Sequence, residues 1–195
     1  MKPKLNQRKE ADKTREAILK AATKLFAKKG FSGTSTASIA KVAQVNEALI
    51  YHHYSNKAEL WKRVKAEITQ KSDVSAIHPT PSSLREFLEE AIQQRLTLYD
   101  NNPALHKIKQ WQRLEDKRDM LVAENPLAPN TWIPAIHYLQ QHNHIKKSLP
   151  ANMIVIWLAS SIDIITQDEL KIFRVHNTRT DYINLIIDCF EKALK

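Results

Sequence analysis

The 195-residue sequence predicts an all-α protein. Apolar residues recur at helical spacing along most of the chain, and sustained period-2 alternation is rare. Only two glycines occur, Gly30 and Gly33, and no Asn-Gly or Asp-Gly pair marks a hairpin turn. The length allows one domain of fair size or two small ones, with a substantial hydrophobic core.

The charge is unevenly distributed. Residues 1–71 contain 16 Lys and Arg against 6 Asp and Glu, a balance of +10, whereas residues 72–195 contain 14 against 15. A solubilising charge would not be confined to one end, so a basic N-terminal third on a neutral remainder favours a module that binds a polyanion such as nucleic acid.

The single cysteine, Cys189, rules out an intrachain disulfide or a cysteine-rich zinc site. Its neighbours Ile186, Ile187 and Phe190 favour a buried, inert thiol. The basic N-terminus has no apolar core typical of a signal peptide, and the most apolar run, Met153–Ile165, is too short to span a membrane. We therefore expect a soluble cytoplasmic protein without membrane contact.

Residues 1–9 are basic and lack an apolar pattern, which predicts a disordered arm. A helix should run from Glu10 or Thr14 to Lys29, with an apolar stripe at i, i+3, i+4, i+7 and i+8 that comprises Ile18, Ala21, Ala22, Leu25 and Phe26. Gly30 is well placed to end this helix in the left-handed conformation. Phe31 should then fold back against the helices that follow.

The stretch Ser35–Tyr54 has room for two short helices around a break at Gln44-Val45-Asn46. This spacing is typical of a helix-turn-helix unit, whose second helix enters the DNA major groove. Asn46 is a suitable N-cap for the second helix, Glu47–His53. The apolar residues expected to join the two helices are Ile39, Ala40 and Ala43 on the first and Ala48, Leu49 and Ile50 on the second, with Val45 filling the turn.

Asn56 followed by Glu59 predicts a capping-box-like start for a further helix that continues to about Lys71. The order and spacing of these blocks resemble the DNA-binding domain of the tetracycline-repressor (TetR) family of bacterial regulators across Thr14–Leu60. The residues that carry the resemblance are TREAILKAATKLFAKKGF, Thr34-Ser35, Ile39-Ala40, Val45-Asn46, Leu49-Ile50-Tyr51-His52-His53-Tyr54 and Asn56-Lys57-Ala58-Glu59-Leu60.

The resemblance implies a dimer that binds a palindromic operator in double-stranded DNA, usually as a repressor that a small ligand releases. Two residues depart from the family pattern: Gln44 stands where a turn glycine is common, and Thr36 where an apolar residue is common. Gln44 is therefore expected to adopt a left-handed or strained conformation.

The predicted DNA-binding residues lie around the two short helices and the start of the next one. None on the second helix is Arg or Lys, so Glu47 is expected to accept from cytosine and Ala48 or Leu49 to touch a thymine methyl group. Tyr51, His52 and Lys57 are expected to contact phosphate, whereas Tyr54 is expected to pack in the core. The full predicted set is Thr34, Ser35, Thr36, Asn46, Glu47, Ala48, Leu49, Tyr51, His52 and Lys57.

The remaining chain predicts further helices, separated by loops rich in Pro and Asn. Their ranges are Ser82–Asp100, Ala104–Glu124, Thr131–His142, Met153–Phe173 and Asp181–Leu194. The last two are apolar on more than one side, which favours a homodimer through these helices, with an internal core as the alternative. We divide the chain into a helix-turn-helix domain at 10–56 and a helical regulatory and dimerisation domain at 57–195, in which residues 57–71 form a connecting helix.

A ligand cavity in the second domain should be lined by apolar and aromatic groups with a few polar ones. The candidates are Trp111, Met120, Trp132, His137, Trp157 and Asp163. Asp163 stands out because a carboxylate within an apolar helix needs a partner, either a cationic ligand or an Arg, Lys or hydroxyl across the dimer. No cofactor is indicated, and His142-x-His144 lacks the spacing of a helical metal site.

The sequence thus predicts a ligand-responsive dimeric repressor. The alternative is a DNA-bound adaptor of the same fold whose C-terminal domain binds a protein partner. An enzyme is not expected, because the sequence contains no Gly-rich phosphate loop, nucleophile elbow or metal-ligand spacing.

Overall fold

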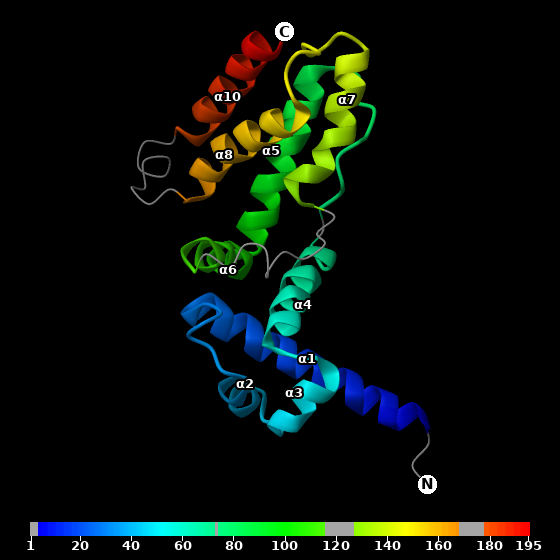
Figure 1. Cartoon of the computed structure of the whole chain (residues 1–195), viewed down its shortest axis with the longest axis vertical. Coiled ribbons are helices and arrows are strands. Elements are labelled where there is room, and N and C mark those ends of the chain that lie inside the picture. The colour runs from blue at the N-terminus through cyan, green and yellow to red at the C-terminus, as the bar shows by residue number, and fades with distance from the viewer. Residues whose placement is uncertain (1–3, 73, 116–126, 168–177) are drawn as a thin grey trace. The chain divides into compact units, whose positions relative to one another are not determined.

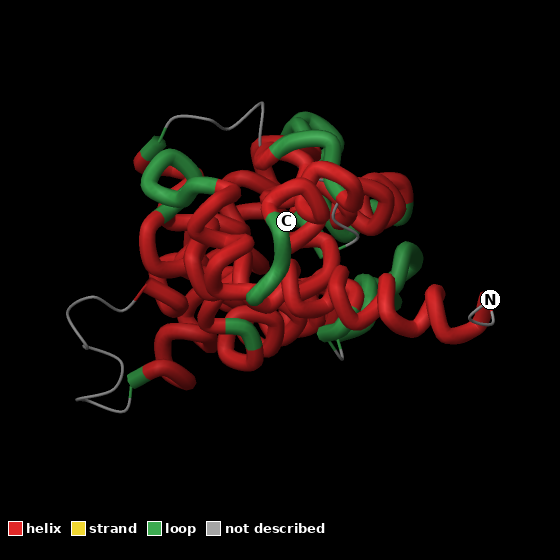
Figure 2. Tube along the Cα trace, turned by 90° about the horizontal axis from the view of Figure 1, so that it is seen from below, coloured by secondary structure: helices red, strands yellow, loops and turns green. Residues whose placement is uncertain are grey.

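The computed structural model describes residues 4–72, 74–115, 127–167 and 178–195, and these contain helices and loops but no strand (Figure 2). The all-α prediction is confirmed. Contacts divide the chain into two compact units, the first comprising residues 1–71 and 102–125 and the second residues 72–101 and 126–195.

The first unit contains five described helices (Figure 1). They are α1 (Lys4–Lys29), α2 (Thr36–Ala43), α3 (Glu47–His53), α4 (Lys57–Gln70) and α6 (Pro103–Leu114). Helix α1 is the centre of this unit, because α2, α4 and α6 all pack against it, while α3 packs against α2.

The N-terminal arm predicted for residues 1–9 is wrong for residues 4–9, because α1 begins at Lys4 rather than at Glu10 or Thr14. Residues 4–13 lack Gly and Pro and consist largely of Lys, Arg, Leu, Gln, Glu and Ala, all good helix formers. The helix therefore extends beyond its apolar stripe without needing a core contact. Residues 1–3 lie outside the described part of the chain.

Aromatic packing joins α1 to α4 in the core of the first unit. The Phe26 ring meets Trp61 edge-on with centroids 4.9 Å apart, and Phe31 meets the same indole at 5.6 Å. Phe26 and Trp61 are fully buried, and Phe31 is 6% exposed, which confirms that Phe31 folds back onto the helices. Because Leu60, Trp61 and Val64 belong to this core, α4 packs with the N-terminal helices, a division that differs from the boundary expected after Asn56.

Helix α6 lies against α1 in the same unit. Its Ile108 is fully buried in the core, and the indole nitrogen of Trp111 donates to the carbonyl of Ala27 at 3.3 Å. Lys65 of α4 donates to Gln112 of α6 at 2.8 Å. Burial, with Lys109 and Lys62 nearby, lowers the pKa of Lys65 to about 8. The helix predicted to reach Glu124 ends at Leu114 in the described chain, and residues 116–126 lie outside it.

The second unit contains α5 (Leu84–Asn101), the 3-10 turn η1 (Pro129–Trp132), α7 (Ile133–Gln141), α8 (Ala151–Gln167) and α10 (Arg179–Leu194). Helix α5 packs against α8 and α10, and α8 also packs against η1 and α7. The helix expected to reach Phe173 is described only to Gln167, because residues 168–177 lie outside the described chain. Within the described residues, no helix is both long enough and apolar enough to cross a membrane.

A buried ion pair joins α5 to α8. Arg95 donates through Nε and a terminal nitrogen to one carboxylate oxygen of Asp163, at 2.8 and 2.5 Å. The two side chains are only 5% and 10% exposed, and the guanidinium also lies over the Tyr99 ring at 5.3 Å. The partner that Asp163 requires is therefore an arginine of its own chain, rather than a cationic ligand or a group across a dimer.

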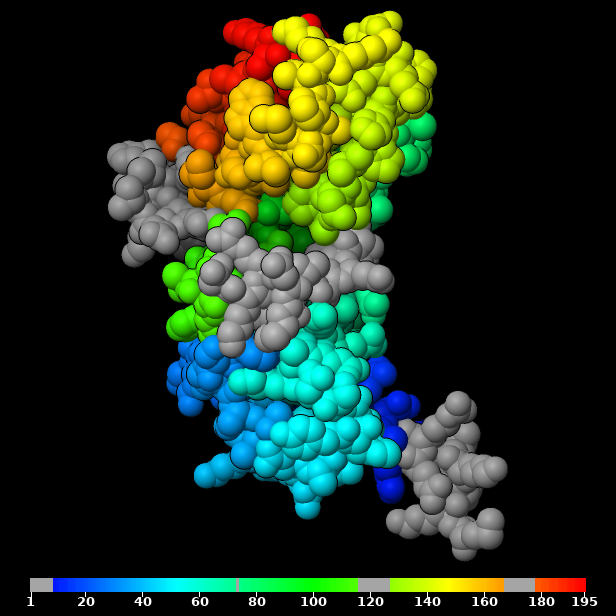
Figure 3. Space-filling model, in the orientation of Figure 1, coloured from blue at the N-terminus to red at the C-terminus, as the bar shows by residue number. Residues whose placement is uncertain are grey.

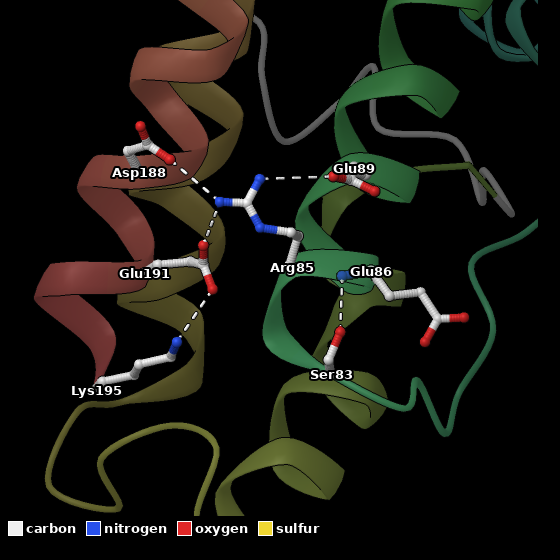
Figure 4. Close-up of polar contacts among 7 residues, drawn as sticks. All are labelled: Ser83, Arg85, Glu86, Glu89, Asp188, Glu191 and Lys195. Atoms are coloured by element: carbon white, nitrogen blue, oxygen red, sulfur yellow. Dashed lines mark hydrogen bonds and ion pairs between the residues drawn. The ribbon is translucent and has the colours of Figure 1, made fainter.

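An exposed network of ions joins α5 to α10 (Figure 4). Arg85, near the start of α5, binds Asp188 at 3.1 Å and Glu191 at 2.5 Å on α10. The hydrogen bonds that the guanidinium group donates to Glu191 and Asp188 raise the pKa of Arg85. Lys195 binds the other Glu191 oxygen at 3.1 Å and lowers the pKa of that carboxyl group.

Replacing Asp163 by Ala should lower the free energy of unfolding by about 3–5 kcal/mol, because it leaves the Arg95 charge buried without its carboxylate. The double variant Arg95→Met/Asp163→Leu should recover most of this loss, since apolar side chains of similar size replace the pair. Urea denaturation followed by circular dichroism measures both. Arg85→Ala, which breaks an exposed pair, is the control and should cost less. A double variant as unstable as Asp163→Ala would contradict the role assigned to the pair.

Candidate DNA-binding interface

Helix α2 packs against α1, and α3 lies beside α2 (Figure 1). Ile39, Ala40 and Ile50 join the pair, since they are 0%, 4% and 0% exposed. Ala48 and Leu49, which we also expected at this contact, are exposed instead. With only seven residues, α3 turns a single apolar residue inward in its first turn, and the two before Ile50 point outward.

The turn between the helices depends on a left-handed residue. Gln44 has φ 56° and ψ 42°, and its N–H bonds to the carbonyls of Ala40 and Lys41 at the end of α2. The conformation expected for this residue is therefore confirmed. A non-glycine residue pays roughly 1–2 kcal/mol to adopt it. Val45 is half-buried beside the turn, where its N–H bonds to the Ala40 carbonyl at 3.1 Å.

Side-chain caps begin α2, α3 and α4. Ser35 Oγ accepts from the Ser38 N–H at 3.1 Å, Asn46 Oδ1 from the Ala48 N–H at 2.9 Å, and Asn56 Oδ1 from the Glu59 N–H at 2.9 Å. Glu59 completes the last cap by accepting from the Ser55 N–H at 2.9 Å, one residue earlier than a capping box requires. Hydrogen bonds from Ser55 lower the pKa of Glu59.

Thr34 does not lie on the exposed face. It is 1% exposed, and its hydroxyl donates to the carbonyls of Gly30 at 2.7 Å and Leu25 at 3.3 Å. These carbonyls belong to the C-terminal end of α1, where backbone acceptors lack partners within the helix. The DNA contact predicted for Thr34 is inconsistent with this burial. Its hydroxyl instead links the α1–α2 turn to α1.

Thr36 connects the N-terminus of α2 to α3. Its hydroxyl donates to Glu47 Oε1 at 2.5 Å and lies 3.0 Å from the Tyr51 hydroxyl. An apolar side chain at this position would leave both groups of α3 without this contact. The departure from the family pattern at Thr36 therefore holds Glu47 and Tyr51 of α3 in place.

The exposed surface of α3 is apolar and aromatic rather than cationic. The cyan segment that includes α3 lies at the surface of the molecule (Figure 3). Leu49 is 38% and Tyr51 52% exposed, and His52 is also exposed, while α3 contains no Arg or Lys. Val42 of α2 adds an exposed apolar side chain, 46% accessible, which the sequence reasoning missed because its helical spacing from Ile39 is that of a core residue. Burial, with His52 and Arg15 nearby, lowers the pKa of His53 and favours its neutral form.

Lys57, at the start of α4, binds the turn between α1 and α2. Its ammonium group donates to the carbonyls of Phe31 at 2.9 Å and Thr34 at 2.8 Å, and lies over the Phe31 ring at 4.3 Å from its centroid. The side chain is half-buried. Lys57 therefore has a structural role in the first unit, in addition to the phosphate contact expected from the sequence.

Known proteins share this arrangement. A sequence model of bacterial regulatory proteins of the tetR family matches residues 18–64, which include all of α2 and α3. The chain is 41% identical over 59 residues to the transcriptional repressor NicS of Pseudomonas putida, a match that covers 30% of this chain and 28% of NicS. It is 27% identical over 174 residues to a probable acrEF/envCD operon repressor of Escherichia coli, covering 83% of this chain and 78% of that protein.

Residues 18–64 of this chain are therefore a DNA-binding domain of the tetR-family type. The fold also agrees, since the transcriptional regulator FadR of Bacillus subtilis, solved in complex with stearoyl-CoA, superposes with a TM-score of 0.62 at 17% identity. That superposition covers 89% of this chain and 97% of FadR. Members of the tetR family are DNA-binding regulators rather than enzymes.

The residues predicted for a ligand cavity do not come together. Trp111 belongs to the first unit, and Met120 lies outside the described residues. In the second unit Trp132 is fully buried and donates to Gln94 at 3.0 Å, whereas His137 is exposed. Asp163 is bound by Arg95, a residue that the sequence reasoning missed although it interrupts an otherwise apolar helical stripe.

The outer face of α8 and α10 carries the most exposed apolar side chains of the second unit. Met153, Ile156, Trp157 and Ile164 of α8 are 62%, 64%, 45% and 55% exposed and follow helical spacing along one side. Leu185 of α10 is 57% exposed, and Cys189 is exposed as well, so the buried position expected for Cys189 is wrong. Inner positions of the same helix, among them Phe190, supply the core instead.

No group of three or more His, Cys, Asp and Glu side chains suited to a metal ion occurs among the residues the structure describes. His142 Nδ1 donates to the Tyr138 carbonyl at 2.9 Å, and its ring packs on that of Tyr138 with centroids 4.0 Å apart.

Lys57→Ala should lower the free energy of unfolding by about 1–3 kcal/mol without DNA, because two carbonyls lose a charged donor. Lys20→Ala, an exposed lysine of α1, is the matched control and should change it little. Chemical denaturation measures both. Unchanged stability in Lys57→Ala would contradict the structural role.

The same variant tests the phosphate contact, which stays a prediction. If Lys57 also binds phosphate, its loss should weaken binding to all DNA sequences alike and reduce the salt slope by about one. A loss confined to one preferred sequence would contradict a phosphate contact and indicate base reading.

Proposed function

We propose that this protein is a transcriptional repressor that binds a palindromic operator as a homodimer and leaves it when a small ligand binds. The proposal rests on α3, whose inward residue Ile50 fixes it against α2 while Leu49, Tyr51 and His52 remain exposed. A helix held in this way is able to enter the major groove with its N-terminal residues against base edges.

In this proposal α3 reads DNA without an Arg or Lys contact. Glu47 is held by Thr36 at 2.5 Å and accepts from a cytosine amino group, while Ala48 and Leu49 contact thymine methyl groups. Tyr51 and His52, together with Ser35, Thr36 and Asn46 at the helix starts, contact the phosphate backbone. Direct contacts of this kind are few, so DNA shape and bridging water contribute to specificity.

The second unit supplies the dimer contact. The exposed apolar stripe of α8, together with Leu185 on α10, is the surface that a second copy would cover. A palindrome requires two recognition helices related by a two-fold axis, and an isologous interface provides that symmetry. Because the partner is chromosomal DNA, the proposal places the protein in the cytoplasm.

Release by a small ligand is supported by the nature of the relatives. NicS and the acrEF/envCD protein are named as repressors, and FadR was solved with stearoyl-CoA. These names favour a regulator over a DNA-bound adaptor that binds a protein. A ligand that binds the folded protein raises its melting temperature and, as an inducer, also lowers its DNA affinity, which an adaptor would not show.

Selection from a random DNA pool with the purified protein should yield a palindrome with half-sites about one helical turn apart. Glu47→Gln should lose roughly 1–3 kcal/mol of discrimination at one base pair in each half-site. A carboxylate can only accept a hydrogen bond, as from the cytosine amino group, whereas an amide also donates and so tolerates other bases. Glu89→Gln, an exposed carboxylate of α5, is the control and should leave the selected sequence unchanged. Selection of unrelated or single sites would contradict the proposed function.

Ile156→Asp should convert the dimer to a monomer in sedimentation equilibrium, because it places a charge in the apolar stripe of α8. Leu114→Asp is the matched control, since Leu114 is 76% exposed on α6 and lies outside this stripe. It should remain a dimer. A dimer for both variants would contradict the assignment of the interface to α8 and α10.

A further inference from the structure

A groove between α1 and α6 lies within the first unit and is separate from the α2–α3 face. Its volume is about 780 Å³, within the range of small-molecule sites. The residues that line it come from one face of α1 and from the length of α6. We call it the α1–α6 groove.

The rim of the groove is cationic. Lys24 and Lys28, one turn apart on α1, and Lys107 of α6 contribute three exposed ammonium groups. Among the described residues that line the groove, none is acidic. Like charges at this spacing repel one another, so an anion between them would gain from all three.

The remaining lining is largely apolar. Leu114 is 76% exposed, and Ala27 and Trp111 form the contact between the two helices. The Trp111 ring is held on two sides, by its hydrogen bond to the Ala27 carbonyl at 3.3 Å and by Gly30, where a Cβ would lie 2.9 Å from the ring. A rigid aromatic surface of this kind binds an apolar group at small entropic cost.

We propose that the α1–α6 groove binds a small amphipathic organic anion. Its carboxylate, sulfonate or phosphate group contacts Lys24, Lys28 and Lys107, and its aliphatic or aromatic body covers Trp111 and Leu114. A DNA backbone would use the lysines alone and leave the apolar floor uncovered, so the lining favours a small molecule over DNA.

The groove adjoins the turn that positions the helix-turn-helix. Trp111 contacts α1 at its C-terminal end, and Glu115, directly after α6, accepts from the Ser32 N–H at 3.0 Å. An anion that alters the α1–α6 contact therefore acts on the segment that Lys57 holds. This consequence rests on the proposed function, whereas binding to the groove does not.

The test uses the full-length protein and 8-anilinonaphthalene-1-sulfonate as the amphipathic anion, with fluorescence titration in the absence of DNA. Saturable binding is expected, with dodecanoate as a competitor and dodecanol a much weaker one. The variant Lys24→Gln/Lys107→Gln should weaken binding by roughly tenfold or more, because two cationic contacts are lost. Lys9→Gln/Lys13→Gln, which removes two exposed lysines of α1 outside the groove, is the matched control and should bind normally.

A second pair of variants separates the groove from the apolar face of α8 and α10. Leu114→Glu should abolish binding by placing a carboxylate beside the anion, and Leu114→Met should retain it. Circular dichroism verifies that each variant is folded. Equal affinity in all variants, or equal competition by dodecanol, would overturn the proposal.

DNA titrations with the same variants test whether the lysines of the groove bind DNA phosphate instead of a small anion. A reduced salt slope for DNA in Lys24→Gln/Lys107→Gln, with unchanged binding of the sulfonate, would show that these lysines contact phosphate and would also overturn the proposal. Because the sulfonate is titrated without DNA, failure of the groove and failure of the proposed function are distinguishable.

Discussion

The reversal of the chain after α1 is the constraint on which the first unit depends. Gly30 has φ +71°, and a side chain there would collide with Trp111 and Glu115, so this position requires glycine both for its backbone and for its space. The carbonyls that the reversal exposes are bound by the Thr34 hydroxyl and the Lys57 ammonium group. Helices α1, α4 and α6 therefore meet at one short turn, and α2 starts directly from it.

The candidate DNA-binding face of α2 and α3 is firmly held, but α3 carries no cationic side chain. Two side-chain caps, a left-handed Gln44 and the Thr36–Glu47–Tyr51 contacts fix α2 and α3 closely. The exposed residues nevertheless lack the guanidinium and ammonium groups that most often read guanine. The positive charge of the N-terminal third lies elsewhere, much of it along α1, where it provides attraction to a polyanion without sequence preference.

The second unit is organised by a polar contact inside an apolar core. Arg95 and Asp163 require one another, because either charge alone would be buried without compensation. Their pairing fixes the register of α5 against α8, and the outer side of α8 is left with its row of exposed apolar residues. At the other end of α5, ion pairs from Arg85 join this helix to α10, and these ion pairs are exposed to solvent (Figure 4).

The sequence by itself determined the helices of the first unit and most of their ends, because caps and stops act over three or four residues. Gly30, Gln44, Asn46 and Asn56 each have the conformation or hydrogen bond that their local pattern predicted. The tetR-family character of residues 18–64 also followed from the sequence, since its motifs are contiguous along α1 to α4.

Only the tertiary structure decided which side chains remain accessible. Thr34 and Lys57 have the same local signals as a phosphate-binding residue, yet their partners are carbonyls of α1 and of the turn, brought near by folding. Asp163 pairs with Arg95, which lies 68 positions away in the sequence. The aromatic residues expected around one cavity belong to two different units. Periodicity specifies that a face is apolar, but the contacts that cover it depend on distant parts of the chain.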